Sequence, residues 1–215
     1  MELKLEHLQY QDVAIQSVAR VFEGTVKNTF DNACVEGIRS NLCTLSDNQL
    51  AENIQAIALE NGINSDTARF STDSDLCIEM ETGTGKTLVY IKTIYELYKQ
   101  YTFTKFIILV PSIAIRQGTL SCFKTFEKQL ESIYVVKIKV FEYDSKKLNN
   151  VTRFIEEQQP HVMIMTTGAF SSDDRILNRA KGKTYSTTYP ILTLLLKFDP
   201  SSSWTSRKKE WIAKI

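Results

Sequence analysis

The chain has 215 residues, of which 43% are hydrophobic and 24% are charged, and its formal net charge is +1. That length allows one or two domains, and the hydrophobic share is large enough to bury a core. A net charge so close to zero indicates nothing about partners by itself.

Targeting and redox signals are absent from the sequence. It has no basic segment followed by an apolar one at the N-terminus, and no apolar run long enough to span a bilayer, so neither a signal peptide nor a membrane helix is predicted. The cysteines are scattered and form no C-x-x-C pair, which speaks against a metal site: Cys34, Cys43, Cys77 and Cys122. Reduced, buried cysteines are therefore expected, as in a cytoplasmic protein.

Two helices are predicted near the N-terminus. Residues 8–23 and 46–62 carry apolar side chains at near-helical spacing, and a glycine ends each segment. The polar span 63–75 is predicted to be a loop. We therefore treat residues 1–75 as an N-terminal helical segment.

A glycine-bearing turn follows the apolar strand predicted at residues 76–80. The segment reads Glu79-Met-Glu-Thr-Gly-Thr-Gly-Lys-Thr87 and leads into a helix predicted at 86–100. Glycines in such a turn let backbone N–H groups close around phosphate oxygens, and a helix N-terminus favours the same anion. Lys86 would then reach the β- and γ-phosphates, and Thr87 would place its hydroxyl on Mg²⁺.

The turn departs from the strict P-loop pattern at one position. Met80 stands where the pattern G-x-x-x-x-G-K-[ST] has its first glycine, but the cradle depends on Gly83 and Gly85. A chance Gly-Lys-Thr is the bland alternative, and the strand before and helix after argue against it. Lys86 and Thr87 are the predicted catalytic residues, and Thr87 is the predicted metal ligand. The predicted phosphate-binding residues are Thr82, Gly83, Thr84, Gly85, Lys86 and Thr87.

Strands and helices alternate through the following residues. Residues 105–110 form an apolar run typical of a parallel strand that is covered on both faces. The other predicted elements are helices at 112–130 and 150–158 and strands at 135–143 and 162–166. This alternation predicts an α/β domain with a doubly wound parallel sheet at 76–178.

A second group of residues follows the strand at 105–110. Pro111 stops that strand, and Ser112 begins the next helix. Ligands meet the carboxyl ends of strands in such a sheet, so Ser112 and Arg116 are expected at the same edge as the P-loop. A hydroxyl, helix N–H groups and a guanidinium together suit a phosphate. Taken alone, these residues are better explained by an ordinary capped helix.

Taken together, these segments resemble the restriction (Res) subunit of type III restriction–modification enzymes, which carries a superfamily 2 helicase-type motor. The resemblance covers about residues 5–178, and its motifs are Leu8–Gln11, Glu79–Thr87, Lys105–Arg116 and Val162–Phe170. It implies a RecA-like P-loop fold that uses ATP and Mg²⁺, acts on duplex DNA and works with a methyltransferase (Mod) partner. It also implies that Gln11 reads adenine, and it implies DNA contacts at Pro111, Ser112, Arg116, Thr167 and Gly168.

Several parts of such an enzyme are missing from the sequence. No Asp-Glu-x-His or Asp-Glu-Pro motif follows Phe170, and we find neither a second motor domain nor a nuclease domain. Without the acidic pair, Mg²⁺ loses a ligand and the attacking water loses its base. We expect a truncated motor part of an ATP-dependent type III site-specific deoxyribonuclease that is inactive alone.

Residues 179–215 have a different character. They are polar and basic without a clear period, which predicts an irregular tail. Codons displaced by two nucleotides permit Pro-Ser-Ile-Ile-Ile-Leu-Asp-Glu-Pro-Gln there, and Trp204-Thr205 forces the Asp. We therefore hypothesise a frameshift after about Arg179 that removes the acidic motif.

Two other interpretations stay open. A complete small P-loop NTPase or kinase would need a Walker B carboxylate, and Asp173 and Asp174 lie beyond the end of the strand at 162–166. A non-enzymatic nucleic-acid-binding module would use Arg116 and the basic tail. Substitution of Lys86 separates the module from the NTPases, because DNA binding alone does not need that lysine.

Overall fold

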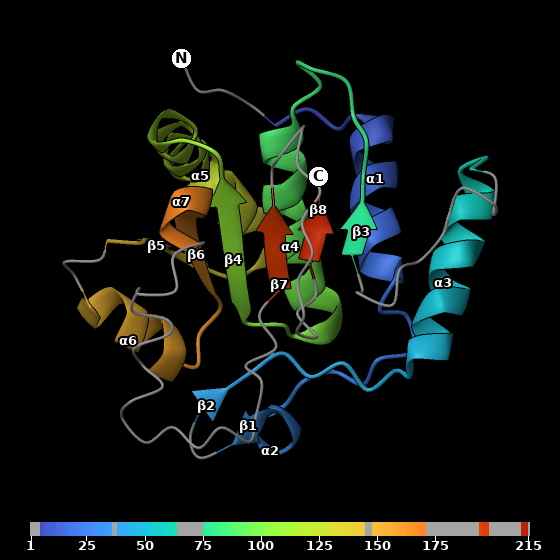
Figure 1. The fold of residues 1–215 in the computed structure, drawn as a ribbon, viewed down its shortest axis with the longest axis horizontal. Coiled ribbons are helices and arrows are strands. Elements are labelled where there is room, and N and C mark those ends of the chain that lie inside the picture. The colour runs from blue at the N-terminus through green and yellow to red at the C-terminus, as the bar shows by residue number, and fades with distance from the viewer. Residues whose placement is uncertain are drawn as a thin grey trace.

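The computed structural model describes residues 5–35, 38–63, 75–144, 148–170, 194–197 and 212–214. A six-stranded sheet lies at its centre in the order β3-β8-β7-β4-β6-β5 (Figure 1), and every neighbouring pair is parallel. The predicted parallel α/β sheet is confirmed, as an incomplete RecA-like fold. The strands are β3 (Asp75–Cys77), β4 (Lys105–Val110), β5 (Lys139–Glu142), β6 (His161–Thr166), β7 (Leu194–Lys197) and β8 (Ile212–Lys214).

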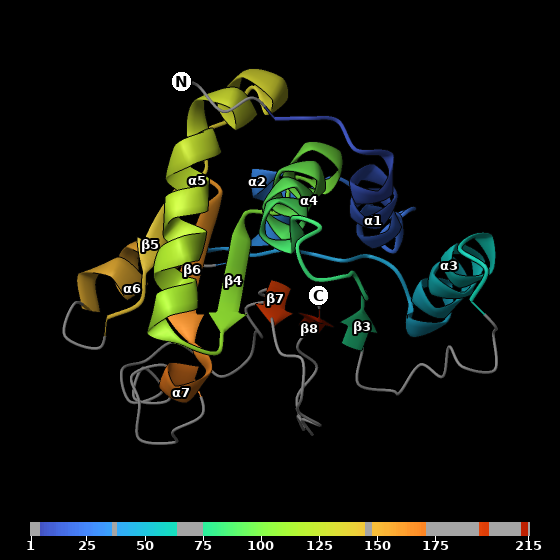
Figure 2. The same ribbon diagram turned by 90° about the horizontal axis from the view of Figure 1, so that it is seen from above.

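Helices pack on both faces of the sheet. Helices α4 and α5 lie against one face, α1 packs on α4, and α3 lies beyond α1 (Figure 2). Helix α6 packs on the opposite face of β4, β5 and β6. These helices are α1 (Gln9–Arg20), α3 (Asp47–Glu60), α4 (Lys86–Tyr101), α5 (Ile113–Tyr134) and α6 (Leu148–Glu156).

Strand β4 is apolar from Phe106 to Val110 because both of its faces are covered. Phe106, Ile108 and Val110 belong to the larger core cluster, under α4 and α5. Ile107 and Leu109 belong to the smaller cluster, under α6. Side chains alternate between the two faces of a strand, so a strand covered on both faces has apolar residues on each, as β4 has from Phe106 to Val110. Burying each such side chain contributes roughly 1.5–3 kcal/mol.

Helix α4 is buried along most of its length because it lies between the sheet and α1. Ile91, Ile94 and Leu97 have no exposed surface. At the far end of the helix pair, the Tyr101 hydroxyl donates to the Ala19 carbonyl at 2.8 Å. The two helices therefore run in the same direction, which places the start of α1 beside the start of α4.

Four short elements ahead of the C-terminal tail were not predicted. They contain too few residues to show a period: α2 (Phe30–Ala33), β1 (Cys34–Val35), β2 (Ile38–Arg39) and α7 (Thr167–Phe170). Strands β1 and β2 form a separate antiparallel pair. Strand β3 is shorter than the predicted 76–80. Strand β5 is shorter than the predicted 135–143, because Val135 has the left-handed conformation of the α5 C-cap and the strand begins only at Lys139.

The C-terminal tail differs from the expectation of an irregular segment at two places. Strand β7 pairs with β4, with Leu195 opposite Ile107, and β8 pairs with β3. The two tail strands therefore lie inside the sheet, between β3 and β4, so an irregular tail is not what the structure has at these residues. The rest of residues 179–215 lies outside the described residues.

The cysteines are less buried than expected. Cys34, Cys43 and Cys122 are free and partly exposed.

Across the described ranges, no helix is both long enough and apolar enough to cross a membrane.

Candidate nucleotide-binding site

Two glycines shape the turn between β3 and α4. The φ angle is 85° at Gly83 and 82° at Gly85, a region that other residues rarely adopt. The Thr84 hydroxyl donates to the Glu81 carbonyl at 2.6 Å, which closes the turn. Gly85 directly precedes α4, and no side chain caps this helix. The N–H groups of Lys86 and Thr87, which precede the first hydrogen bond of the helix, are thus left for a ligand.

Lys86 and Thr87 are the first two residues of α4, and both are partly exposed. The Gly85 carbonyl accepts hydrogen bonds from the N–H groups of Leu88 at 2.9 Å and Val89 at 3.1 Å, so the helix is regular from its first turn. Both side chains therefore start at the positive end of the helix dipole, where an anion is favoured.

Tyr90 lies one turn along α4 from Thr87. Its hydroxyl lies 2.8 Å from the Thr119 hydroxyl of α5. Burial raises the pKa of Tyr90, so the phenol stays neutral. No sequence motif points to Tyr90, because its partner Thr119 is brought near only by the packing of α4 on α5.

Gln11, in the first turn of α1, lies against the glycine turn. Its side chain is 3% exposed, and its Nε2 donates to the Thr84 carbonyl at 3.0 Å. Within the described residues its Oε1 is buried and has no hydrogen-bond partner. An unsatisfied buried acceptor costs about 1–3 kcal/mol, so the oxygen marks a place where a ligand donor is favoured. The 6-amino group of a purine is such a donor.

Gly85 is required by its neighbour as well as by its φ angle. A Cβ atom there would lie 2.7 Å from the Nε2 atom of Gln11. Real Cβ atoms essentially never approach so closely, so a larger residue would displace Gln11 or the turn.

Four of the five predicted DNA-contacting residues follow the ends of β4 and β6. Val110 is opposite Thr166 in the parallel pair, so the residues after them emerge at the same edge of the sheet. Pro111, Ser112 and Gly168 are exposed and Thr167 is partly exposed. The Ser112 side chain accepts a hydrogen bond from the Ile115 N–H at 3.3 Å, so Ser112 is an ordinary N-cap of α5.

Arg116 reaches the same edge but has a protein partner. Its Nη2 lies 2.6 Å from a Glu142 carboxylate oxygen, and its Nη1 donates to the Tyr143 carbonyl at 3.3 Å. Both partners lie at the end of β5. The arginine side chain is only 16% exposed. Its charge is therefore neutralised locally, which the spacing of the sequence could not indicate.

The acidic residues considered for a Walker B role, Asp173 and Asp174, lie outside the described residues. In the part of the chain that is described, no group of three or more His, Cys, Asp or Glu side chains could hold a metal ion. Thr87 remains the group with the chemistry and position to contact Mg²⁺ beside a bound phosphate.

An uncapped helix after a glycine turn, at the carboxyl edge of a parallel sheet, is the arrangement of P-loop α/β proteins. Comparison with known proteins gives the family. The family model described as "Type III restriction enzyme, res subunit" matches residues 4–191, and the chain belongs to this family.

Two relatives illustrate the extent of the similarity. The chain is 31% identical over 145 residues to the type III restriction-modification enzyme EcoP15I Res subunit of Escherichia coli, covering 66% of this chain and 15% of that protein. It is 26% identical over 227 residues to the EcoPI Res subunit of Escherichia phage P1, covering 96% of this chain and 22% of that protein. The chain thus matches less than a quarter of the length of either relative.

The frameshift hypothesis stays a prediction. The family match runs to residue 191, beyond Arg179, but the extent of a protein alignment does not locate a break in the reading frame.

Proposed function

We propose that this chain is the N-terminal, ATP-binding motor part of a type III restriction endonuclease Res subunit. In the whole protein this part would couple ATP hydrolysis to DNA translocation and cleavage. The observation that carries the proposal is the joint arrangement of Gln11, Thr84 and Gly85, which sets a buried acceptor with no partner among the described residues beside an uncapped helix N-terminus. The Gln11 oxygen suits the amino group of an adenine, and the N-terminus of α4 suits a phosphate.

Different groups of the glycine turn and of α4 would bind different parts of ATP–Mg²⁺. Backbone N–H groups from Thr82 to Thr87 would surround the phosphates, and the Lys86 ammonium would add a charge-assisted hydrogen bond. Bound ATP–Mg²⁺ would supply the phosphoryl group whose transfer to water drives a motor. Thr87 would contact the metal ion through its hydroxyl.

Duplex DNA is the proposed substrate. Pro111, Ser112, Thr167 and Gly168 offer an exposed edge with a helix N-terminus, which suits a DNA phosphate. Arg116 would join them only after exchanging Glu142 for a phosphate. A methyltransferase (Mod) partner would recognise the DNA site, and the assembly would work in the cytoplasm.

ATP hydrolysis tests whether the chain can turn over nucleotide by itself. The sequence has no Asp-Glu motif after Phe170, so we expect no DNA-stimulated ATP turnover by this chain alone. Phosphate release is measured with ATP–Mg²⁺, with and without linear duplex DNA. Turnover that rises with DNA and is lost in Lys86→Ala would contradict the proposal and favour a self-contained NTPase.

A further inference from the structure

Two side chains of α1 donate hydrogen bonds to one carbonyl oxygen of the glycine turn. The Tyr10 hydroxyl lies 3.1 Å from the Thr84 oxygen, and the Gln11 Nε2 lies 3.0 Å from the same atom. The residues that meet here are more than 70 positions apart in the chain. A carbonyl oxygen has two lone pairs, so both donors can be accommodated at once.

These two bonds fix the orientation of a whole peptide unit. The Thr84–Gly85 peptide is planar and trans, so its C=O and N–H groups point in opposite directions. Because the Thr84 oxygen is held toward α1, the Gly85 N–H must point away from α1. Gly85 directly precedes α4, and its N–H belongs to the group of donors expected to surround a phosphate.

The nitrogen and the oxygen of the Gln11 amide have different roles. Its nitrogen is engaged by the turn, and its buried oxygen has no partner within the described residues. Both Gln11 and Tyr10 donate to the Thr84 oxygen, but only Gln11 also has an atom proposed to contact the nucleotide. The Tyr10 hydroxyl is thus the group whose removal isolates the effect of peptide orientation.

We infer that Tyr10 is a positioning residue of the nucleotide site: it holds the Thr84–Gly85 peptide so that the Gly85 N–H faces the bound phosphate. This inference rests on the proposed function and adds a residue to it. Tyr10 touches neither base nor phosphate in this account. It acts through one peptide unit, so its hydroxyl affects every nucleotide alike, whatever the base.

The packing of α1 does not depend on the Tyr10 hydroxyl. Tyr10 is 48% exposed, whereas Ile15, Val18 and Ala19 are 3%, 2% and 0% exposed and form the buried face of the helix. The Ala19 carbonyl is also bonded by Tyr101. Tyr10→Phe should therefore leave the fold intact while releasing one of the two bonds to Thr84.

The test compares Tyr10→Phe with wild type and with Tyr98→Phe, a partly exposed tyrosine of α4. Dissociation constants are measured for ATP–Mg²⁺ and for ITP–Mg²⁺, which has a 6-oxo group in place of the 6-amino group. We expect Tyr10→Phe to weaken both nucleotides about three- to tenfold, the effect of one neutral hydrogen bond, and to leave their ratio unchanged. Tyr98→Phe should match wild type.

An amide measurement follows the peptide directly. In wild type, the Gly85 N–H resonance should shift and become protected from exchange when ADP–Mg²⁺ binds. In Tyr10→Phe at saturating ADP–Mg²⁺, that protection should fall. A merely structural role would lower the unfolding midpoint without a selective change at Gly85.

Each remaining outcome has a definite meaning. If wild type binds no nucleotide, the proposed function fails and the inference falls with it. If wild type binds but Tyr10→Phe binds both nucleotides equally well, or alters only their ratio, the inference alone is wrong.

Discussion

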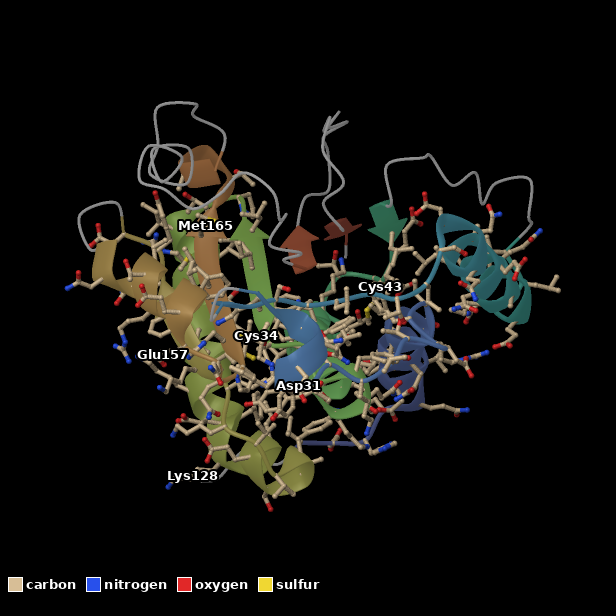
Figure 3. The ribbon with its side chains drawn as sticks, turned by 90° about the horizontal axis from the view of Figure 1, so that it is seen from below. Asp31, Cys34, Cys43, Lys128, Glu157 and Met165 are labelled. Atoms are coloured by element: carbon tan, nitrogen blue, oxygen red, sulfur yellow. The ribbon has the colours of Figure 1, made fainter. Side chains whose placement is uncertain are left out.

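Lys105 and His161 lie opposite each other at the amino ends of β4 and β6, and both are buried, with exposed fractions of 1% and 0%. The Lys105 ammonium donates to the carbonyl of Phe154 at 2.6 Å and to that of Glu157, at the end of α6. A cation among the last carbonyls of a helix stabilises that end. Figure 3 shows Glu157 and Met165 near opposite ends of β6, so this cluster lies away from the nucleotide site.

His161 predicts a loss of stability in acid. Burial and the nearby Lys105 lower its pKa from 6.5 to about 4, with Lys139 adding to the effect and the Glu157 carboxylate opposing it. Between these values the unfolded chain binds a proton that the folded chain does not, so stability falls as the pH drops from about 6.5 to 4. The loss should be on the order of 3 kcal/mol.

Urea unfolding at a series of pH values measures this loss. His161→Phe should flatten the decline between pH 6.5 and 4. His7→Gln, a change of an exposed histidine that pairs with Asp12, is the matched control and should keep the wild-type slope. An unchanged slope in His161→Phe would show that another group is responsible.

Asn41 ties the start of β4 to the segment after β2. It is 2% exposed; its Oδ1 accepts hydrogen bonds from the N–H groups of Thr104 at 2.7 Å and Lys105 at 3.1 Å, and its Nδ2 donates to the Lys105 carbonyl at 2.7 Å. Asn41→Ala leaves buried backbone groups unpaired and should cost about 2–4 kcal/mol of unfolding free energy. Asn48→Ala, at an exposed position of α3, should change stability by less than about 0.5 kcal/mol. Equal effects of the two substitutions would contradict this.

Gly85 and Gly118 should respond to alanine in opposite ways. Gly85→Ala places a Cβ 2.7 Å from the Gln11 Nε2 at a φ of 82°, so we expect nucleotide binding to be lost and stability to fall by about 1–3 kcal/mol. Gly118 lies inside α5, and no described atom beyond its chain neighbours and the backbone of its own helix lies within 4 Å of an added Cβ, so Gly118→Ala should stabilise the protein by about 0.5–1 kcal/mol. Thermal unfolding and ATP titration of both variants decide the matter.

The Arg116–Glu142 pair predicts an unusual effect on DNA binding. Glu142→Gln removes the carboxylate that neutralises Arg116, so affinity for duplex DNA should rise several-fold and depend more steeply on salt. Arg116→Ala in the Glu142→Gln background should remove that gain. A gain that survives in the double variant would mean that Arg116 does not contact DNA.

The P-loop could be predicted from sequence because its information is local: adjacent residues supply the strand, the glycines and the helix start. Gln11 could be placed only through the family resemblance. Tyr10 and Asn41 could not be predicted, because their partners are backbone groups 63 to 74 positions away. The tail strands were missed for a similar reason, since segments as short as Ile212–Lys214 become strands only by pairing with β3 and β7.

The most direct test of the account is a calorimetric titration of the chain with ATP–Mg²⁺. Wild type should bind, and Lys86→Ala should bind at least tenfold more weakly, because the lysine provides a charged donor to the phosphates. Lys99→Ala, an exposed change in the last turn of the same helix, should match wild type. Equal binding by wild type and Lys86→Ala, or no binding by wild type, would contradict the assignment of this turn as the nucleotide site.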